Sequence, residues 1–481
     1  MAGVMIAAGK SGSGKTMVTC GLLSLLERKG WDPWGFKCGP DYIDGLFHRK
    51  VLGVESGNLD SFFESPEHMR RKYSGAAMDH FAVVEGVMGY FDGLGGICVK
   101  GSSYEVAGIL EIPVILVVDA KGASLSLAAQ IHGFMEYIPP YDRGESPSCH
   151  NHIAGVLFNR MSPMIYEQMG KLVEEQLHIP VVGYVPELDF LQVQSRHLGL
   201  ILPHEIEGLK GQMEQLADVM ERTVDIKKLA AVSGYVNGQA KIREKNSREK
   251  NSKEECAQKT DSKKNIERFS LGVAMDEAFC FYYRDNLDAM EQAGARLVYF
   301  SPVHDRELPD GLDGLLFGGG YPENHAGQLS ENVTMRLSVS EAAKRGMPIL
   351  GECGGYLYLL DTLEGADGQD YPMAGVFSGR GYRGREKGRF GYITLYPERE
   401  LPYMPAGGWI KGHEFHYWNC EVKKEDCVMT ARKPVGDRSW PCMRSEGNVM
   451  AGFPHLYYPS CPQLVERFAA GCIKFGKETR A

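Results

Sequence analysis

Eight consecutive residues near the N-terminus have the types and spacing of a phosphate-binding loop. The run Gly9-Lys10-Ser11-Gly12-Ser13-Gly14-Lys15-Thr16 fits the pattern G-x-x-x-x-G-K-[ST] at every fixed position. In such a loop, glycines such as Gly12 and Gly14 let backbone N–H groups point at phosphate oxygens. Lys15 then reaches the terminal phosphates, and Thr16 can hold Mg2+. The sequence therefore predicts a nucleotide-binding site.

Four acidic residues lie in or next to loops that follow apolar runs and could complete this site. They are Asp41, Asp44, Glu85 and Asp92. Mg2+ in proteins usually takes one or two carboxylates together with water and phosphate oxygens. We expect Asp41 and Glu85 to hold Mg2+ with Thr16, and Asp44 and Asp92 to contact substrate or a second metal position. Each aspartate taken alone is better explained as a turn residue or a helix cap, so the prediction depends on all four together.

A second reactive group lies far along the chain. The run Gly351-Glu352-Cys353-Gly354-Gly355 follows an apolar run and has the form of a nucleophile elbow. Such a turn lifts one side chain out of a sheet and lets the next N–H, here that of Gly354, stabilise an oxyanion. A helix beginning there would lower the pKa of the Cys353 thiol. Gly319, within the run 318–320, could supply a second oxyanion donor.

A cysteine nucleophile also needs a base. His455 is our candidate, because it lies in a late loop among short apolar residues. His413 and His416 compete with it. A single histidine is more often structural than catalytic, so the spacing alone leaves the three open.

The elements that must position these residues alternate between strands and helices. Apolar runs of strand length include residues 4–8, 34–38, 81–86, 114–119 and 153–159 in the first half, and 271–275, 296–300, 314–317 and 348–352 in the second. Fully apolar strands that alternate with helices indicate a parallel sheet covered on both faces. Ligands bind such sheets at the carboxyl ends of the strands. The fold class is therefore α/β, with the candidate residues expected at those ends.

One polar segment divides the chain. Residues 236–268 are dominated by Lys, Glu, Asn, Ser and Gln, with almost no large apolar side chains. Such a segment buries too little surface to offset its ordering entropy, so we expect an exposed linker. The predicted domains are residues 1–235 and 269–475.

Composition excludes several classes of protein. The formal net charge of -9 argues against a nucleic-acid partner, since no basic field is available. The 12 cysteines show no paired metal-ligand spacing, which favours free thiols in a reducing cytoplasm. No window approaches the roughly 18 apolar residues that a spanning helix needs, and the N-terminus leads straight into an apolar strand. We expect a cytoplasmic protein without a membrane partner.

Taken together, these motifs resemble the cobyrinic acid a,c-diamide synthases, a family of corrinoid glutamine amidotransferases. The motifs that carry the resemblance lie at residues 39–44, 84–89, 91–93, 196–200, 318–323 and 351–355. The resemblance extends from Met5 to about Tyr458. It implies an N-terminal synthetase domain of the dethiobiotin-synthetase type and a C-terminal class I-like glutaminase domain.

The resemblance also implies a reaction and roles for residues. ATP would phosphorylate the a and c acetate carboxylates of cobyrinic acid in turn, and ammonia from glutamine would displace phosphate. Cys353 would attack glutamine with His455 as its base. The usual third member of class I triads, a Glu two residues after the His, is replaced here by Tyr457.

Other functions compete with this interpretation. The same chemistry could act on hydrogenobyrinic acid or a nickel sirohydrochlorin, or on the side chains that a cobyric acid synthase amidates. A protein of another class, a partitioning-type ATPase, would use Lys10 as a second phosphate-loop lysine, although an exposed loop lysine is the simpler explanation. A catalytically inactive C-terminal half is the remaining alternative.

Overall fold

The computed structural model describes residues 2–139, 151–191, 208–235, 267–384 and 389–480. The chain forms two compact units, which we call the N-terminal and C-terminal units. The predicted linker, apart from Glu267 and Arg268, and the 196–200 motif lie outside the described residues. Within the described residues, no helix has the length and apolar character needed to cross a membrane.

The N-terminal unit is built on one sheet of seven strands. Its strands are β1 (Gly3–Ala8), β2 (Pro33–Cys38), β3 (Ser56–Leu59), β4 (Phe81–Glu85), β5 (Val114–Asp119), β6 (Ile153–Asn159) and β7 (Val181–Val185). They pair in the order β3-β2-β4-β1-β5-β6-β7, and every pair is parallel. β1 lies between β4 and β5, so the chain order reverses there and the loop after β1 opens at a switch point of the sheet.

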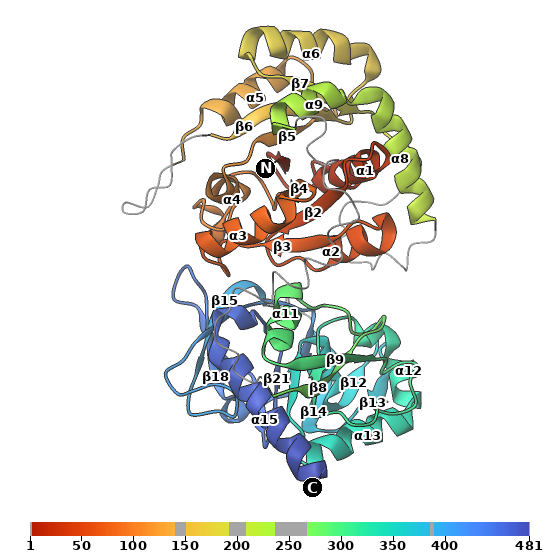
Figure 1. Ribbon diagram of the computed structural model, residues 1–481, viewed down its shortest axis with the longest axis vertical. Coiled ribbons are helices and arrows are strands. Elements are labelled where there is room, and N and C mark those ends of the chain that lie inside the picture. The colour runs from red at the N-terminus through yellow and green to blue at the C-terminus, as the bar shows by residue number, and fades with distance from the viewer. Residues whose placement is uncertain (1, 140–150, 192–207, 236–266, 385–388, 481) are drawn as a thin grey trace. The chain divides into compact units, whose positions relative to one another are not determined.

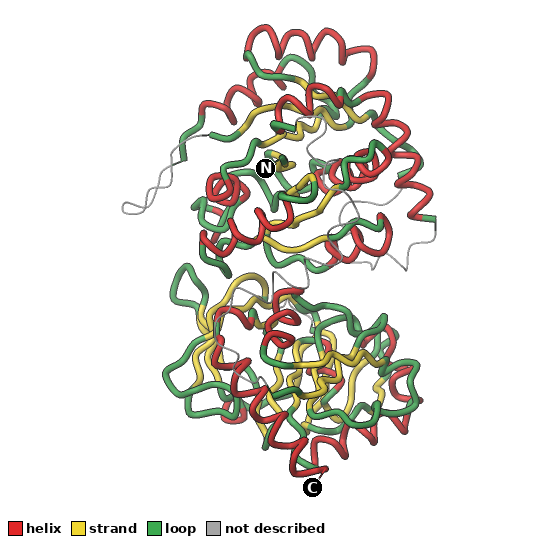
Figure 2. The backbone as a smooth tube through the Cα atoms, in the orientation of Figure 1, coloured by secondary structure: helices red, strands yellow, loops and turns green. Residues whose placement is uncertain are grey.

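Helices cover both faces of this sheet, as Figure 2 shows by the yellow strands lying between red helices. The helices are α1 (Lys15–Arg28), α2 (Ile43–Phe47), α3 (Pro66–Ala77), α4 (Ser103–Leu110), α5 (Ser126–Glu136), α6 (Pro163–Leu177), α8 (Leu209–Thr223) and α9 (Ile226–Ser233). Alternate residues of β1 join different cores: Val4 and Ile6 pack with α1 and α8, and Met5 packs with α3 and α4. Burial on both faces explains why the strands are continuously apolar.

The C-terminal unit has a six-stranded sheet and two smaller ones (Figure 1). The main sheet has the order β20-β21-β11-β10-β8-β9, and only β20 pairs antiparallel. Its strands are β8 (Phe269–Ala274), β9 (Ala295–Phe300), β10 (Gly314–Phe317), β11 (Ile349–Glu352), β20 (Arg444–Glu446) and β21 (Val449–Gly452). This sheet carries the predicted elbow at the carboxyl end of β11.

The remaining elements pack around the main sheet. The helices are α11 (Arg284–Gln292), α12 (Ala326–Glu331), α13 (Val333–Lys344), α14 (Gly354–Tyr358) and α15 (Pro462–Arg480), and the 3-10 turn η4 spans Pro322–His325. One small sheet contains β12 (Leu360–Glu364), β13 (Asp370–Pro372), β14 (Phe377–Arg383) and β17 (Trp418–Cys420). The other contains β15 (Phe390–Pro397), β16 (Ile410–Phe415), β18 (Met429–Arg432), β19 (Ser439–Cys442) and β22 (His455–Leu456).

Candidate functional sites

The phosphate loop joins β1 to α1, as the sequence pattern predicts. Gly14 stands at the N-cap of α1 with φ +91° and ψ +18°, a backbone conformation that L side chains rarely adopt. A Cβ atom there would lie only 2.1 Å from Nδ2 of Asn159, which itself donates to the carbonyl oxygen of Ser13 at 2.9 Å. Asn159, at the end of β6, therefore holds the loop in place by a hydrogen bond, and only glycine fits at position 14. Sequence analysis did not single out Asn159.

A cavity of about 220 Å³ opens beside this loop. Its lining includes Gly9, Lys10, Ser13, Asp119, Lys121 and Gln130. Lys10 is exposed. Loop amides at a helix N-terminus next to an open cavity form a site suited to a phosphate group and its attached nucleoside.

Lys15 folds back over the loop. Its Nζ donates to the carbonyl oxygen of Met88 at 2.5 Å and to that of Lys10 at 3.3 Å. Burial, together with the nearby charge of Lys37, lowers the pKa of the Lys15 ammonium to about 8. The Lys15 side chain is therefore held in place, and nearby groups compensate its positive charge only in part, as expected of a cation that binds an anionic ligand.

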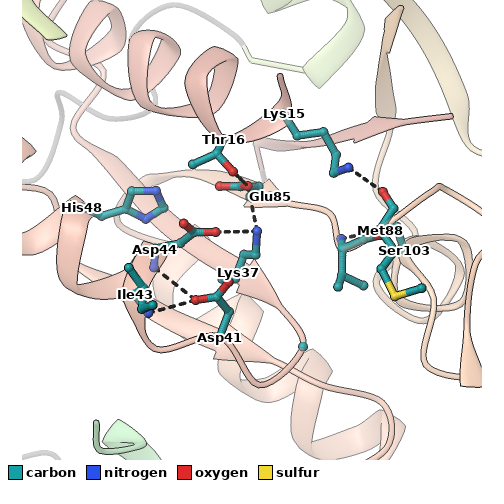
Figure 3. Close-up of polar contacts among 12 residues, drawn as sticks. Lys15, Thr16, Lys37, Asp41, Ile43, Asp44, His48, Glu85, Met88 and Ser103 are labelled. Atoms are coloured by element: carbon teal, nitrogen blue, oxygen red, sulfur yellow. Dashed lines mark hydrogen bonds and ion pairs between the residues drawn. The ribbon is translucent and has the colours of Figure 1, made fainter. Parts of the chain in front are cut away.

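A buried ion cluster lies under the loop (Figure 3). Lys37, on β2, places its Nζ 2.5 Å from Oδ2 of Asp44 and 2.7 Å from Oε1 of Glu85. The hydroxyl of Thr16 donates to the same Oε1 at 2.5 Å. Thr16, Asp44 and Glu85 were predicted from the sequence, whereas Lys37 was missed. A single lysine inside an apolar strand was the signal available, because such a residue is seldom buried unless it is paired.

Burial and the neighbouring charges shift the pKa values of Glu85, Lys37 and the nearby Asp41. Burial raises the pKa of Glu85 to about 7, and the charge of Asp44 adds to the rise while Lys37 opposes it. Burial alone would lower the pKa of Lys37, but the charges of Asp44, Glu85 and Asp41 outweigh it and hold that pKa well above its usual value. Burial and the charge of Asp44 raise the pKa of Asp41 to about 6.

The other two predicted carboxylates have structural roles as well. Oδ1 of Asp41 accepts the backbone N–H groups of Ile43 and Asp44 at 2.9 and 3.3 Å, which fixes the turn that leads into α2. Oδ2 of Asp92 accepts the N–H of Gly89 at 3.0 Å, and the negative charge of Asp92 opposes the fall in the pKa of Lys15. Asp92 thus lies beside Lys15, whereas Asp41 lies near Lys37.

The cluster fits a magnesium ion bound together with nucleotide. The second carboxylate oxygen of Glu85, Oε2, is buried and has no hydrogen-bond partner among the described residues. No group of three or more acidic, His or Cys side chains surrounds a metal position in the described part of the chain. Phosphate and water oxygens would therefore have to complete the ligand set, which is how Mg2+ usually binds.

The elbow at Cys353 has the expected backbone. Cys353 joins β11 to α14 with φ +48° and ψ -103°, a strained conformation for a non-glycine residue. The expected fall in its pKa is wrong. Burial raises the pKa of the thiol above its usual value, and the charge of Glu323 adds to this effect. α14 has only five residues, and its N-terminus does not offset the loss of solvation.

Glycines bring the cysteine turn and His455 together. A Cβ on Gly354 would lie 3.0 Å from the backbone nitrogen of Gly320. A Cβ on Gly319 would lie 2.3 Å from Cε1 of His455. The turn after Cys353 and the imidazole of His455 therefore both pack against the 318–320 backbone, with no room for side chains. Gly319 thus lies against His455, and Gly354 directly follows Cys353 and packs against the backbone of Gly320.

His455 begins β22, which pairs with β16 so that His455 lies opposite His413. The two rings stack with centroids 4.8 Å apart, and Nδ1 of His413 is 3.0 Å from the hydroxyl of Tyr283. Burial, with a smaller effect of the His416 charge, lowers the pKa of His455 to about 3. The imidazole of His455 is therefore neutral at pH 7, although burial also makes it a weaker base than a solvated histidine.

Glu352 is the last residue of β11, and its side chain links the Cys353 turn to the segment that carries His455. Its buried carboxyl group accepts hydrogen bonds from the hydroxyl of Tyr458 and the N–H of Leu456, while burial raises its pKa to about 8. Sequence analysis did not assign Glu352 a role. Tyr457, which stands where a triad Glu is usual, instead donates its hydroxyl to Asp285 at 2.9 Å.

The N-terminal unit thus has a phosphate loop on a parallel sheet, and the C-terminal unit has a cysteine elbow beside a histidine. Together they define an ATP-dependent amidotransferase that carries its own glutaminase. Family profiles agree with this class. Residues 4–200 match the CobQ/CobB/MinD/ParA nucleotide binding domain, and residues 270–461 match the CobB/CobQ-like glutamine amidotransferase domain.

Curated relatives match almost the whole chain. A cobyrinate a,c-diamide synthase of Caldanaerobacter subterraneus is 34% identical, covering 98% of this chain and 99% of its own. Synthases of the same name from Listeria innocua and Salmonella typhimurium are 36% and 35% identical, and the matches cover 97% of this chain and 99% and 97% of theirs. The chain belongs to the cobyrinate a,c-diamide synthase family. It is a nucleotide-binding, glutamine-dependent ligase that forms amides.

Proposed function

We propose that this protein converts the a and c acetate carboxylates of cobyrinic acid to amides, using ATP and glutamine. The observation that carries the proposal is the presence of both half-sites in one chain that spans nearly the full length of synthases of that name. A partitioning-type ATPase would have no use for a glutamine amidotransferase domain.

Glutamine hydrolysis is assigned to the C-terminal unit. The Cys353 sulfur attacks the side-chain amide carbon, and its proton passes to the neutral His455 imidazole. The N–H groups of Gly354 and Gly319 are proposed to stabilise the oxyanion. His455 then returns the proton to the leaving nitrogen, so that ammonia departs and a thioester remains. Water hydrolyses the thioester to glutamate and restores the thiol.

Carboxylate activation is assigned to the N-terminal unit. A carboxylate oxygen of the substrate attacks the terminal phosphorus of ATP, ADP leaves, and an acyl phosphate forms. Ammonia then attacks the acyl carbon, and phosphate leaves with the former carboxylate oxygen. Lys15 binds the phosphates of ATP during the transfer. Asp44 and Asp92 are proposed to contact the substrate.

Thr16 and Glu85, with Asp41 nearby, would hold Mg2+. The ion would neutralise charge on the phosphates when bound. Lys37 keeps Glu85 and Asp44 fixed before nucleotide arrives, since both carboxylates bind its ammonium group.

Amidation assays with either nitrogen source test this proposal. The protein is incubated with ATP, Mg2+ and cobyrinic acid, with glutamine or with a high concentration of ammonium, and the corrinoid is analysed by mass spectrometry. We expect two successive replacements of an oxygen by an NH group. Cys353→Ala should abolish amidation with glutamine and leave it intact with ammonium. Amidation of hydrogenobyrinic acid or a nickel sirohydrochlorin, but not of cobyrinic acid, would refute the substrate assignment.

A further inference from the structure

Met88 lies beside the phosphate loop in a backbone conformation that a residue with a side chain seldom adopts. Its φ is +47°, in the left-handed region that favours glycine. Non-glycine residues held there cost free energy and gather at functional sites. The Met88 side chain is 46% exposed, although its neighbours Gly86, Gly89 and Tyr90 are buried. One exposed apolar side chain is ordinary, so it is the combination with this backbone and this place that needs an explanation.

Hydrogen bonds on both sides of Met88 fix its backbone. The hydroxyl of the buried Ser103 accepts the N–H of Val87 at 2.8 Å and donates to the carbonyl oxygen of the same residue at 3.1 Å. On the other side, the N–H of Gly89 donates to Oδ2 of Asp92 at 3.0 Å. The surrounding structure therefore imposes the conformation of Met88, and with it the exposure of the side chain.

The segment that carries Met88 is attached to the phosphate loop. The carbonyl oxygen of Met88 accepts from Nζ of Lys15 at 2.5 Å, and Figure 3 shows the thioether of Met88 extending away from that ammonium group. The N–H of Tyr90 donates at 2.8 Å to the carbonyl oxygen of Ala8, the last residue of β1. Met88 is therefore next to the place where Lys15 binds the terminal phosphates of a nucleotide.

The proposed substrate must approach this place closely. Its reacting group is an acetate, in which a single methylene group joins the carboxyl carbon to the corrin ring. A carboxylate oxygen that attacks the terminal phosphorus of ATP therefore brings the ring itself to the rim of the phosphate loop. The ring has a large apolar surface, which is bound best by apolar side chains. The residues already assigned to this site, Lys15, Asp44, Glu85 and Asp92, supply only charged groups.

We propose that the side chain of Met88 packs against the apolar surface of the corrin ring and helps to hold the acetate at the terminal phosphate of ATP. A thioether is flexible and polarizable, so it adapts to an irregular apolar surface. The imposed backbone keeps this side chain exposed before the substrate arrives, which lowers the entropy lost on binding. The inference rests on the proposed function, because its ligand is the substrate assigned to the N-terminal unit.

Two substitutions separate the side chain of Met88 from its backbone. Met88→Leu keeps an apolar side chain, whereas Met88→Gln keeps the length of the side chain and makes it polar. Neither is branched at Cβ, so both meet the same backbone strain at φ +47°. The KM values for cobyrinic acid and for ATP are measured with ammonium as the nitrogen source, so that glutamine hydrolysis does not contribute.

Met78→Gln is the matched control. Met78 is the C-cap residue of α3 and is 72% exposed. It precedes β4, whereas Met88 follows that strand, so the two methionines lie at opposite ends of β4. A general effect of a polar residue at an exposed methionine would therefore appear in both variants, and an effect on substrate binding only in Met88→Gln.

The expected change concerns the corrinoid alone. Met88→Gln should raise the KM for cobyrinic acid about three- to tenfold, because about half of a methionine side chain would be buried by the ring. Equilibrium binding of cobyrinic acid in the presence of ADP, followed by the absorbance of the corrin, should weaken by the same factor. The KM for ATP should not change. Met88→Leu and Met78→Gln should resemble the wild type.

Two results would overturn the proposal. One is unchanged binding of cobyrinic acid by a folded Met88→Gln variant. The other is an equal rise in the KM for ATP, which would place the effect on the backbone contact with Lys15. If Met88→Gln lowers the unfolding temperature, Met88→Ala replaces it under the same criteria.

The wild type reports separately on the proposed function. If it amidates hydrogenobyrinic acid or a nickel sirohydrochlorin instead of cobyrinic acid, the substrate assignment fails and the Met88 variants are compared on that macrocycle. If it amidates none of the three, the proposed reaction fails and the role of Met88 with it. If the wild type amidates cobyrinic acid and Met88→Gln binds it equally well, only the role of Met88 fails.

Discussion

Replacing Gly319 by alanine should displace the proposed base without disturbing the rest of the fold. Gly319 is not among the glycines with a positive φ, so alanine is compatible with its backbone. The added Cβ would lie 2.3 Å from Cε1 of His455, whereas ordinary contacts of a Cβ begin at 3.4 Å. The ring or the glycine backbone must therefore move by about 1 Å, which can cost on the order of 100-fold in rate at a catalytic group.

The loss should be confined to one nitrogen source. We expect Gly319→Ala to lower the kcat/KM for glutamine by about 100-fold, because His455 no longer reaches the thiol. Amidation from ammonium uses the N-terminal unit and should remain at the wild-type rate. Initial rates of glutamate release and of amide formation under both conditions measure the two effects.

A matched substitution controls for general effects of an added methyl group. Gly327 lies in α12, where a new Cβ would meet the Tyr371 ring at an ordinary 3.6 Å. Gly327→Ala should keep both activities. The reasoning is refuted if Gly319→Ala retains glutamine-dependent activity within about threefold of wild type, or if it loses ammonium-dependent activity equally.

Three other predictions concern buried charges. The pKa of Lys15 is about 8, so ATP affinity measured by calorimetry should fall above that pH by up to about tenfold per pH unit. Lys15→Arg should bind ATP with no such fall, and an unchanged slope would contradict the assignment. Lys37→Met should destabilise the N-terminal unit by about 3–5 kcal/mol at pH 8 in urea unfolding, because it leaves a buried carboxylate pair. Because Lys37 lowers the pKa of Glu85, the loss of Lys37 should raise that pKa above its wild-type value of about 7, and the penalty should shrink as the pH falls and Glu85 takes up a proton. A penalty that does not change with pH would count against this account. Because the pKa of Glu352 is raised to about 8 from 4.5, folding binds its proton and the free energy of unfolding should fall as pH rises between those values. Glu352→Gln should remove this slope and keep glutaminase activity, whereas Glu352→Ala should lose about 1–3 kcal/mol of stability. If the two variants have the same stability and activity, the hydrogen bonds of the Glu352 carboxyl group do not stabilise the segment around His455.

The central strands could be predicted closely from the sequence. The runs 114–119, 153–159 and 314–317 match β5, β6 and β10 at both ends, because strands buried on both faces are apolar throughout. The edge strand β3, with the sequence SGNL, has no apolar signal and was missed. It forms because its backbone pairs with β2, which is a tertiary contact that local sequence does not encode.

The candidate site residues could also be predicted only in part, because tertiary contacts determine the rest. Motif residues such as Lys15, Glu85 and Cys353 were found because their chemistry is tied to a local turn. Lys37 was missed because its pairing with Glu85, which is distant in sequence, depends on the fold. The pKa of Cys353 was predicted in the wrong direction, since burial is set by the surrounding fold and here outweighs the effect of the helix N-terminus.

The most direct test follows the nitrogen atom. Glutamine with a heavy-nitrogen label in its side-chain amide is supplied with ATP, Mg2+ and cobyrinic acid, together with unlabelled ammonium at a concentration too low to support amidation by itself, and the corrinoid product is weighed by mass spectrometry. Transfer from the Cys353 site to an ATP-activated carboxylate predicts two new amides that both carry the label, and none in Lys15→Ala. Product amides without the label, or labelled amides formed by the Lys15 variant, would contradict this account.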